Sequence, residues 1–410
     1  MKINKKTIYY GYVVAAASAV IMIVGYGTNY SYSVFFDSLS SQFNWTKGAA
    51  SWAFSIATLI SGLLGIFAGR ISDRLGPKAV SIFCGCAFGL GYVLMSLVQS
   101  PWQVYLIYGT FLAIGAGGLF PTAVSTVARW FTGKRGMMTG VVTAGLGVGT
   151  VIFAPLISHF IAAYSWRTAY VIIGIIAFVV IVGAALFLKR EPGQSDTALE
   201  SDKGKQKTSL PDGKDFTYRQ AVRTKQFWMV AVIYFCFGYC QFSIMVHIVP
   251  YAGSLGINPI SAAAVLSTIG ASSIFGRLII GNISDRFKVK PLLISILAFM
   301  VVSLVGLEFS QKLWALFPVG IIFGLAYGGS STIQSLVTVE LFGLSSLGAL
   351  IGSLVFSVCI GGAIGPVLTG YLADWFHSYQ LAILICIAAA LTGLIFVFWL
   401  TPPKRRGEEK

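Results

Sequence analysis

Long apolar runs alternate with short polar breaks along almost the whole chain. A helix needs about 20 mainly apolar residues to cross a bilayer. By that measure twelve runs can span, near residues 10–36, 48–68, 78–98, 102–128, 136–160, 168–188, 227–252, 260–282, 290–308, 313–339, 347–372 and 378–400. The pattern predicts an all-α membrane protein with twelve transmembrane helices.

A long polar stretch interrupts this pattern, from Lys189 to about Arg223. It mixes Gly, Pro, Ser, Asp, Glu and Lys, and it carries too few apolar residues to bury a core of its own. We therefore expect two six-helix bundles, residues 1–190 and 223–410, joined by a linker at residues 191–222.

The two halves of the chain repeat one another. Residues 69–78, after the second run, return as residues 281–290 after the eighth run, 212 residues later. Pro155 in the fifth run and Pro366 in the eleventh are 211 residues apart. Halves that repeat with the same topology predict pseudo-symmetric bundles that flank a cavity at the membrane midplane.

Composition and charge fit a membrane protein and set its expected orientation. Charged residues make up 10% of the chain and hydrophobic residues 56%, whereas soluble domains carry about 25% charged residues. The net charge of +15 does not indicate nucleic-acid binding, because the basic residues lie in the breaks between apolar runs. With both termini placed inside, 25 of the 29 Lys and Arg residues fall on the inner side. The positive-inside rule then predicts cytoplasmic termini, and we expect a multi-pass protein of a bacterial inner membrane.

Signatures of catalysis or of a cofactor are not found in the sequence. The six cysteines all fall inside apolar runs, and no Cys, His, Asp and Glu residues share a metal-binding spacing. A Gly-x-x-x-x-Gly-Lys loop for nucleotide phosphates is also missing. We expect no enzyme activity, no cofactor, no metal and no ATP-driven transport.

Arg277 is a full charge in the middle of the eighth run. A buried arginine costs at least about 2.5–3.5 kcal/mol on insertion scales, and it cannot lose its charge. No carboxylate lies near the middle of any apolar run. Because a guanidinium matches a carboxylate bidentately, we expect Arg277 to bind the carboxylate of a substrate. Alternatively, Arg277 extends to the inner interface, since Asp285 follows two turns later.

Further candidates lie on the same apolar runs. His247 could take up a proton near neutral pH, or it could be a neutral hydrogen-bonding residue near the outer mouth of the cavity. Aromatic and aliphatic walls with a few polar groups suit a small organic acid. The expected cavity residues, each of which could instead serve helix packing, are Asn29, Tyr30, Leu119, Leu146, Tyr239, Gln241, Ser273, Tyr327, Gln334, Phe356 and Cys359.

Charged residues at the inner helix ends are candidates for gating. Arg129 and Glu340 occupy equivalent places in the repeat, 211 residues apart, with opposite charge. We expect these residues to join charge pairs that hold the halves together while the cavity faces outward. The other members of this group are Asp73, Arg74, Asp285 and Arg286.

The pattern Gly-x-x-x-Asp-Arg-x-Gly-x-Lys at residues 69–78 resembles the signature loop of the major facilitator superfamily. Other stretches resemble its monocarboxylate transporter and oxalate:formate antiporter branches, namely residues 30–36, 129–131, 223–228 and 247–251, together with Arg277. The resemblance implies a secondary transporter that works by alternating access, commonly as a monomer. It also implies that an arginine at the place of Arg277 binds the substrate carboxylate.

The chain departs from these branches at several charged positions. Ser254 and Ser273 stand where several relatives carry an acid that handles protons, Tyr30 aligns with a lysine, and Leu354 lies near a second basic residue. One central positive charge favours a monoanion over a dianion. We therefore expect a carrier of a small monocarboxylate such as lactate or pyruvate. Either the substrate or His247 would carry a coupled proton, or transport would run as exchange.

Two other function classes stay open. The first is an exporter of drugs or amphipathic anionic metabolites, although a cationic drug would need a buried acid. The second is a transporter-like receptor, which short tails disfavour.

Overall fold

The computed structural model describes residues 9–131, 135–190, 216–283, 288–343 and 346–401. Regular structure in these ranges is helical throughout, and twelve helical spans are long and apolar enough to cross a membrane. The twelve spans expected from the sequence are therefore confirmed. They are Tyr10–Phe43, Lys47–Ala68, Pro77–Met95, Pro101–Trp130, Met137–Ala163, Trp166–Ala185, Lys225–Ser254, Pro259–Ile283, Val289–Glu308, Leu313–Phe342, Ala349–Trp375 and Gln380–Trp399.

Several spans are divided into more than one helix. The helices of the first half are α1 (Tyr10–Tyr30), α2 (Tyr32–Phe43), α3 (Lys47–Leu75), α4 (Pro77–Met95), α5 (Pro101–Ile107), the short π-helical segment η1 (Tyr108–Leu112), α6 (Ala113–Trp130), α7 (Arg135–Ala163) and α8 (Trp166–Ala185). Those of the second half are α10 (Tyr218–Val222), α11 (Lys225–Ser254), α12 (Pro259–Ile283), α13 (Val289–Glu308), α14 (Leu313–Phe342), α15 (Leu347–Trp375) and α16 (Gln380–Trp399).

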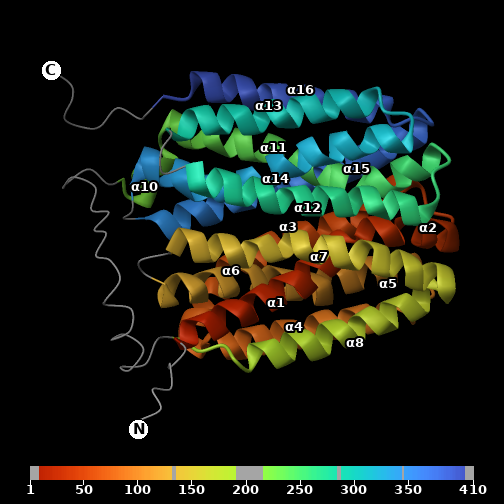
Figure 1. The fold of residues 1–410 in the computed structure, drawn as a ribbon, viewed down its shortest axis with the longest axis horizontal. Helices are drawn as coiled ribbons and strands as arrows, with labels where there is room; N and C mark the ends of the chain where they lie inside the picture. Colours follow the sequence, from red (N-terminus) through yellow and green to blue (C-terminus); the bar gives the residue numbers. More distant parts are fainter. Residues whose placement is uncertain (1–8, 132–134, 191–215, 284–287, 344–345, 402–410) are drawn as a thin grey trace, which may run out of the picture.

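The helices lie roughly parallel, in two groups (Figure 1). Helices α1 to α8 form one group and α11 to α16 the other, and they meet where α3 and α7 pack against α15 and α12. We call the end that holds the start of α1 and the end of α16 the termini end, and the opposite end, which holds α2, the far end. The expected boundaries of the two bundles stay a prediction, because most of the expected linker lies outside the described residues.

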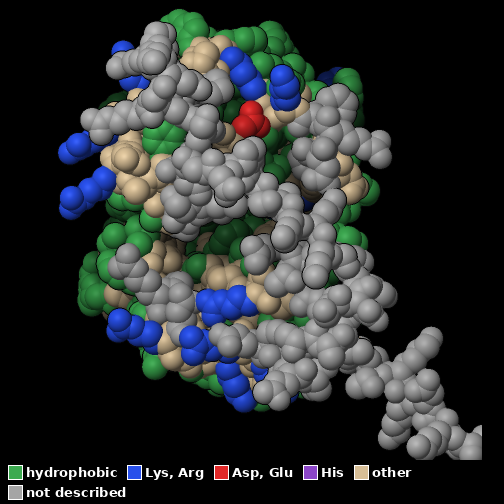
Figure 2. Space-filling view, turned by 90° about the vertical axis from the view of Figure 1, so that its left-hand side faces the viewer, with side chains coloured by type: hydrophobic (Ala, Val, Ile, Leu, Met, Phe, Trp, Pro, Cys, Tyr) green, Lys and Arg blue, Asp and Glu red, His purple; other side chains and the backbone are tan. Residues whose placement is uncertain are grey.

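Basic side chains gather around the termini end (Figure 2). Three basic residues, Lys47, Arg167 and Lys312, instead follow or precede loops at the far end. This distribution is the one from which cytoplasmic termini are expected, and the orientation itself stays a prediction.

The first span differs from expectation, since its helix breaks at Ser31 and continues as α2 to Phe43. The Ser31 hydroxyl donates to the carbonyl of Gly27, 2.7 Å away, so the side chain satisfies backbone at the break.

Beyond the break, α2 docks on α11 of the other half. Pro250 has no N–H, so the carbonyl of Val246 lacks its helical donor. The Ser33 hydroxyl donates to that carbonyl at 2.8 Å and accepts from the N–H of Val249 at 3.2 Å. A proline in one half is thus compensated by a serine in the other, as backbone polar groups in a membrane require.

Candidate functional site

Arg277 lies in the middle of α12 with 1% of its surface exposed. Its Nη1 donates to the Ser273 hydroxyl at 2.7 Å and to the Ser273 carbonyl at 3.2 Å. The guanidinium also lies over the ring of Tyr327, 4.9 Å from its centroid. Ser273 is one turn back toward the far end, so the side chain does not extend toward the termini end.

The other edge of the guanidinium is formed by Nε and Nη2. Nε and Nη2 have no hydrogen-bond partner among the described residues, although both are buried. These two N–H groups point the same way from one edge of the planar group, which is the fork that accepts both oxygens of a carboxylate. A buried charge with unpaired donors is costly, so this edge is suited to an anion.

Ser273 positions the arginine. Its hydroxyl accepts from Nη1 and also donates to the carbonyl of Gly270 at 2.7 Å. Two glycines of neighbouring helices pack against Ser273. A Cβ built on Gly147 of α7 would lie 2.7 Å from the Ser273 hydroxyl, and one built on Gly328 of α14 would overlap the Ser273 carbonyl. Helices from both halves therefore confine the group that orients the guanidinium.

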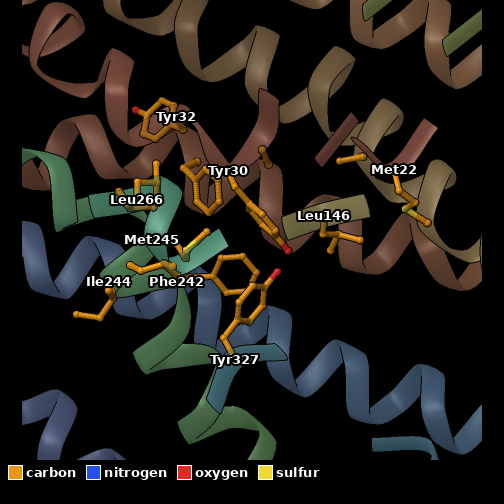
Figure 3. Packing of buried hydrophobic residues seen from close by; sticks show 14 of the residues in the cluster. Met22, Tyr30, Tyr32, Leu146, Phe242, Ile244, Met245, Leu266 and Tyr327 are labelled. Carbon is orange, nitrogen blue, oxygen red and sulfur yellow. The ribbon is translucent and has the colours of Figure 1, made fainter. Parts of the chain in front are cut away.

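Aromatic side chains from both halves meet beside Arg277. The ring of Tyr30 in α1 lies 6.2 Å from those of Tyr327 in α14 and Phe242 in α11, and 5.7 Å from that of Tyr26. Figure 3 shows the hydroxyl ends of Tyr30 and Tyr327 pointing toward one another, with Leu146 beside them. The Tyr327 hydroxyl has no hydrogen-bond partner among the described residues. This group joins apolar ring faces to the Tyr327 hydroxyl, which faces that of Tyr30, and to the Nε and Nη2 donors of Arg277.

The remaining expected cavity residues lie in several places, with Tyr239 and Gln241 buried on α11. Leu119 is fully buried and packs against α1 at Gly25. Cys359 and Phe356 are half-buried and instead contact α3 at Gly62, at the boundary between the halves. Asn29 is half-buried on α1.

Gln334 is half-buried, and its Nε2 atom is buried without a hydrogen-bond partner among the described residues. It follows Tyr327 by two turns on α14, so the two side chains share a face of that helix. Tyr26 and Phe242 were not expected from the sequence. The spacing of Tyr26 and Tyr30, four residues apart, is the signal that could have identified Tyr26.

His247 lies away from this group, near the far end, and is 3% exposed. Its Nε2 is 2.8 Å from the carbonyl of Pro366 and 3.0 Å from the Ser51 hydroxyl, and its Nδ1 is 3.3 Å from the Tyr379 hydroxyl. A carbonyl only accepts, so Nε2 carries a proton, and Nδ1 can accept from the tyrosine. Both ring nitrogens thus have partners, and the choice between the two roles considered for His247 stays a prediction.

The expected gating residues are described only in part. Asp285 and Arg286 lie outside the described residues, as does the side chain of Asp73. Arg74 is exposed, and Arg129 is half-buried at the end of α6. Glu340 accepts from the N–H of Val289 at 3.3 Å, at the start of α13 in its own half. The expected charge pairs stay a prediction.

A family model described as Major Facilitator Superfamily matches residues 18–307 and 250–410. The chain belongs to the Major Facilitator Superfamily. Among its relatives, Monocarboxylate transporter 12 of Rattus norvegicus is 25% identical over 97% of this chain and 86% of the relative. The Oxalate:formate antiporter of Oxalobacter formigenes is 31% identical over 64% of this chain and 58% of the antiporter.

Solved structures of the superfamily share the fold. A bacterial homolog of the human lysosomal transporter Spinster, in an inward-facing and occupied conformation, superposes with a TM-score of 0.76. The match covers 96% of this chain and 97% of that one at 16% identity. This facilitator thus has the fold of transporters and is related to monocarboxylate transporters.

In this facilitator the two halves meet mainly at the far end. Contacts there join Ser33 to Val246, Ser51 to His247, and Trp52 to Tyr371. Toward the termini end, a Cβ on Gly140 of α7 or Gly352 of α15 would meet no described atom within 4 Å. These hydrogen bonds between the halves close the far end of the described structure.

Proposed function

We propose that this facilitator carries small monocarboxylates of the lactate or pyruvate kind across a membrane, with Arg277 binding the carboxylate. The observation that carries the proposal is the unpaired edge of the Arg277 guanidinium, where Nε and Nη2 are buried without partners among the described residues. A carboxylate would fill both donors and neutralise the charge in one step.

The charge of the site supports a monoanion. Arg277 is buried among aromatic rings, and no second basic side chain contacts this group among the described residues. The ring faces of Tyr30, Tyr327 and Phe242 would pack against the short carbon chain. The hydroxyl of Tyr327 would hydrogen-bond a second polar group, such as a 2-hydroxyl or 2-oxo oxygen.

Alternating access would proceed by rocking of the halves around this site. We place the termini in the cytoplasm of a bacterial cell, with the protein working as a monomer in the inner membrane. The relation to monocarboxylate transporters supports coupling to a proton, and the relation to an antiporter supports exchange. The substrate itself is the simplest proton carrier, since His247 is hydrogen-bonded on both nitrogens.

The aromatic faces around Arg277 would also suit an amphipathic anion larger than lactate. An exporter of such metabolites is the second candidate, and it would use the same arginine. Competition between lactate and longer-chain monocarboxylates distinguishes the two, because a carrier of small acids would not accept the longer chains.

Uptake of labelled lactate into liposomes tests the proposal, with and without an inward proton gradient. We expect Arg277→Gln to abolish uptake while the purified protein keeps its melting temperature in detergent. Lys312→Gln is the matched control, because it removes a basic group from a far-end loop and should transport normally. Normal uptake by Arg277→Gln would contradict the assigned role of Arg277. Inhibition by oxalate as strong as by acetate would contradict the preference for a monoanion.

A further inference from the structure

At the far end, a carboxylate of one half caps a helix of the other. The N–H groups of Lys47 and Gly48, which open α3, donate to the two oxygens of Asp374 at 2.9 and 2.8 Å. Asp374 lies in the last turn of α15. The first amides of a helix have no partner within it, and the positive end of the helix dipole favours a carboxylate there.

The same turns of α3 make two further contacts with the other half. The Lys47 ammonium lies 4.5 Å from the ring centroid of Tyr379, and the Tyr379 hydroxyl is 3.3 Å from His247. Ser51, one turn after Lys47, is 3.0 Å from His247, which also donates to the carbonyl of Pro366. His247 thus lies between α3 of one half and α15 of its own half.

Backbones approach closely at this place. A Cβ built on Gly370 of α15 would lie 2.7 Å from the Cα of Gly48. Nearby, the indole N–H of Trp52 donates to the hydroxyl of Tyr371 at 3.3 Å. The start of α3 and the end of α15 therefore pack directly against one another.

We propose that Asp374, the first turn of α3 and His247 form a latch that holds the far end closed and is released when that end opens. Asp374 and Lys47 are only half-buried, so water can solvate the carboxylate and the helix amides after they part. The contacts of the latch can therefore break and form again. This assigns His247 to closure of the far end, and it draws on the proposed transport only in requiring that the far end opens.

Hydrogen–deuterium exchange on the full-length protein in nanodiscs, without substrate, tests the latch. We expect Asp374→Asn to speed amide exchange at the start of α3 by about tenfold, because charge-assisted bonds are stronger than neutral ones. It should also slow exchange around Gly140 and Gly352, since opening one end closes the other. Local loss of a cap would not produce that second, distant effect.

Matched variants complete the test. Glu308→Gln removes a carboxylate from the same end without touching α3, and it should leave both regions unchanged. Ser51→Ala breaks the bond to His247 and should cause a smaller shift of the same kind, which decides the question if Asp374→Asn does not fold. Faster exchange confined to the far end, or no change at all, would overturn the latch. Neither outcome depends on which substrate is carried, so failure of the proposed function would be recognised separately.

Discussion

Arg277 holds its charge with one edge of its guanidinium paired and the other edge unpaired among the described residues. Ser273 fills the paired edge through two contacts to Nη1, which fixes the plane of the group and leaves Nε and Nη2 aimed together. A serine also adds no negative charge, so the arginine keeps its full charge until an anion binds. In the proposed function, this orientation by a neutral neighbour would favour an anion at Nε and Nη2.

The hydroxyl of Tyr327 gives a prediction at the same scale. It is buried without a partner, and removing such a group is nearly neutral or stabilising in the empty protein. We expect Tyr327→Phe to keep or slightly raise the melting temperature, yet to weaken lactate binding about fivefold to tenfold, as loss of a hydrogen bond worth about 1–1.5 kcal/mol implies.

Calorimetric titration with lactate, alongside thermal melts with and without it, measures both effects. Tyr234→Phe is the control, because its hydroxyl is also buried without a partner. Among the described residues, its ring is not paired with those of Tyr30 or Tyr327. Equal lactate affinity in Tyr327→Phe and the wild type would show that this hydroxyl does not touch the substrate.

At the scale of helices, α7 and α12 touch through glycine. A Cβ on Gly147 would overlap the carbonyl of Gly270 and crowd the Ser273 hydroxyl, whereas one on Gly140 would meet no described atom within 4 Å. The two glycines are seven residues apart, so they lie on nearly the same face of α7. The same Gly→Ala substitution can therefore be compared on α7 at a crowded position, Gly147, and at an open position, Gly140.

We expect Gly147→Ala to destabilise the protein by roughly 1–3 kcal/mol, the usual range for overpacking, and to weaken lactate binding because Ser273 must shift. Gly140→Ala should be neutral in both respects. Thermal melts and binding titrations of the two variants check this pair. Equal behaviour of the two alanine variants would mean that α7 can move away from α12 without consequence.

Helix positions were predictable from sequence because lipid imposes long apolar runs, and all twelve expected spans are present. The break at Ser31 was not, because neither Gly nor Pro occupies that position. Arg277 stood out as an isolated charge, but its unpaired edge depends on how Ser273 and Tyr327 pack. The partners of His247, namely Ser51, Pro366 and Tyr379, come from distant parts of the chain that sequence spacing cannot bring together.

At the scale of the whole molecule, the proposed role of Arg277 implies that closure around it differs between the substrate-free and the substrate-bound protein. When the substrate-free protein changes between its two open states, the halves must enclose a guanidinium with two unpaired donors. With a carboxylate bound, the same movement encloses a neutral pair, which avoids most of the desolvation cost of an isolated charge. The loaded protein should therefore cross between its two open states more readily than the empty one.

This difference predicts that exchange is faster than net transport. We expect labelled lactate to leave loaded liposomes at least about tenfold faster when unlabelled lactate is present outside, since every 1.4 kcal/mol of extra barrier slows a step about tenfold. The pH is kept equal on both sides and the membrane potential is clamped, so that neither gradient contributes. Asp374→Asn serves as the contrast, because it weakens a contact between the halves without changing the surroundings of Arg277. Exchange should therefore stay faster than net transport in this variant. Equal rates with and without outside lactate would mean that the empty protein closes over Arg277 without hindrance, and that another group or trapped water satisfies its free edge.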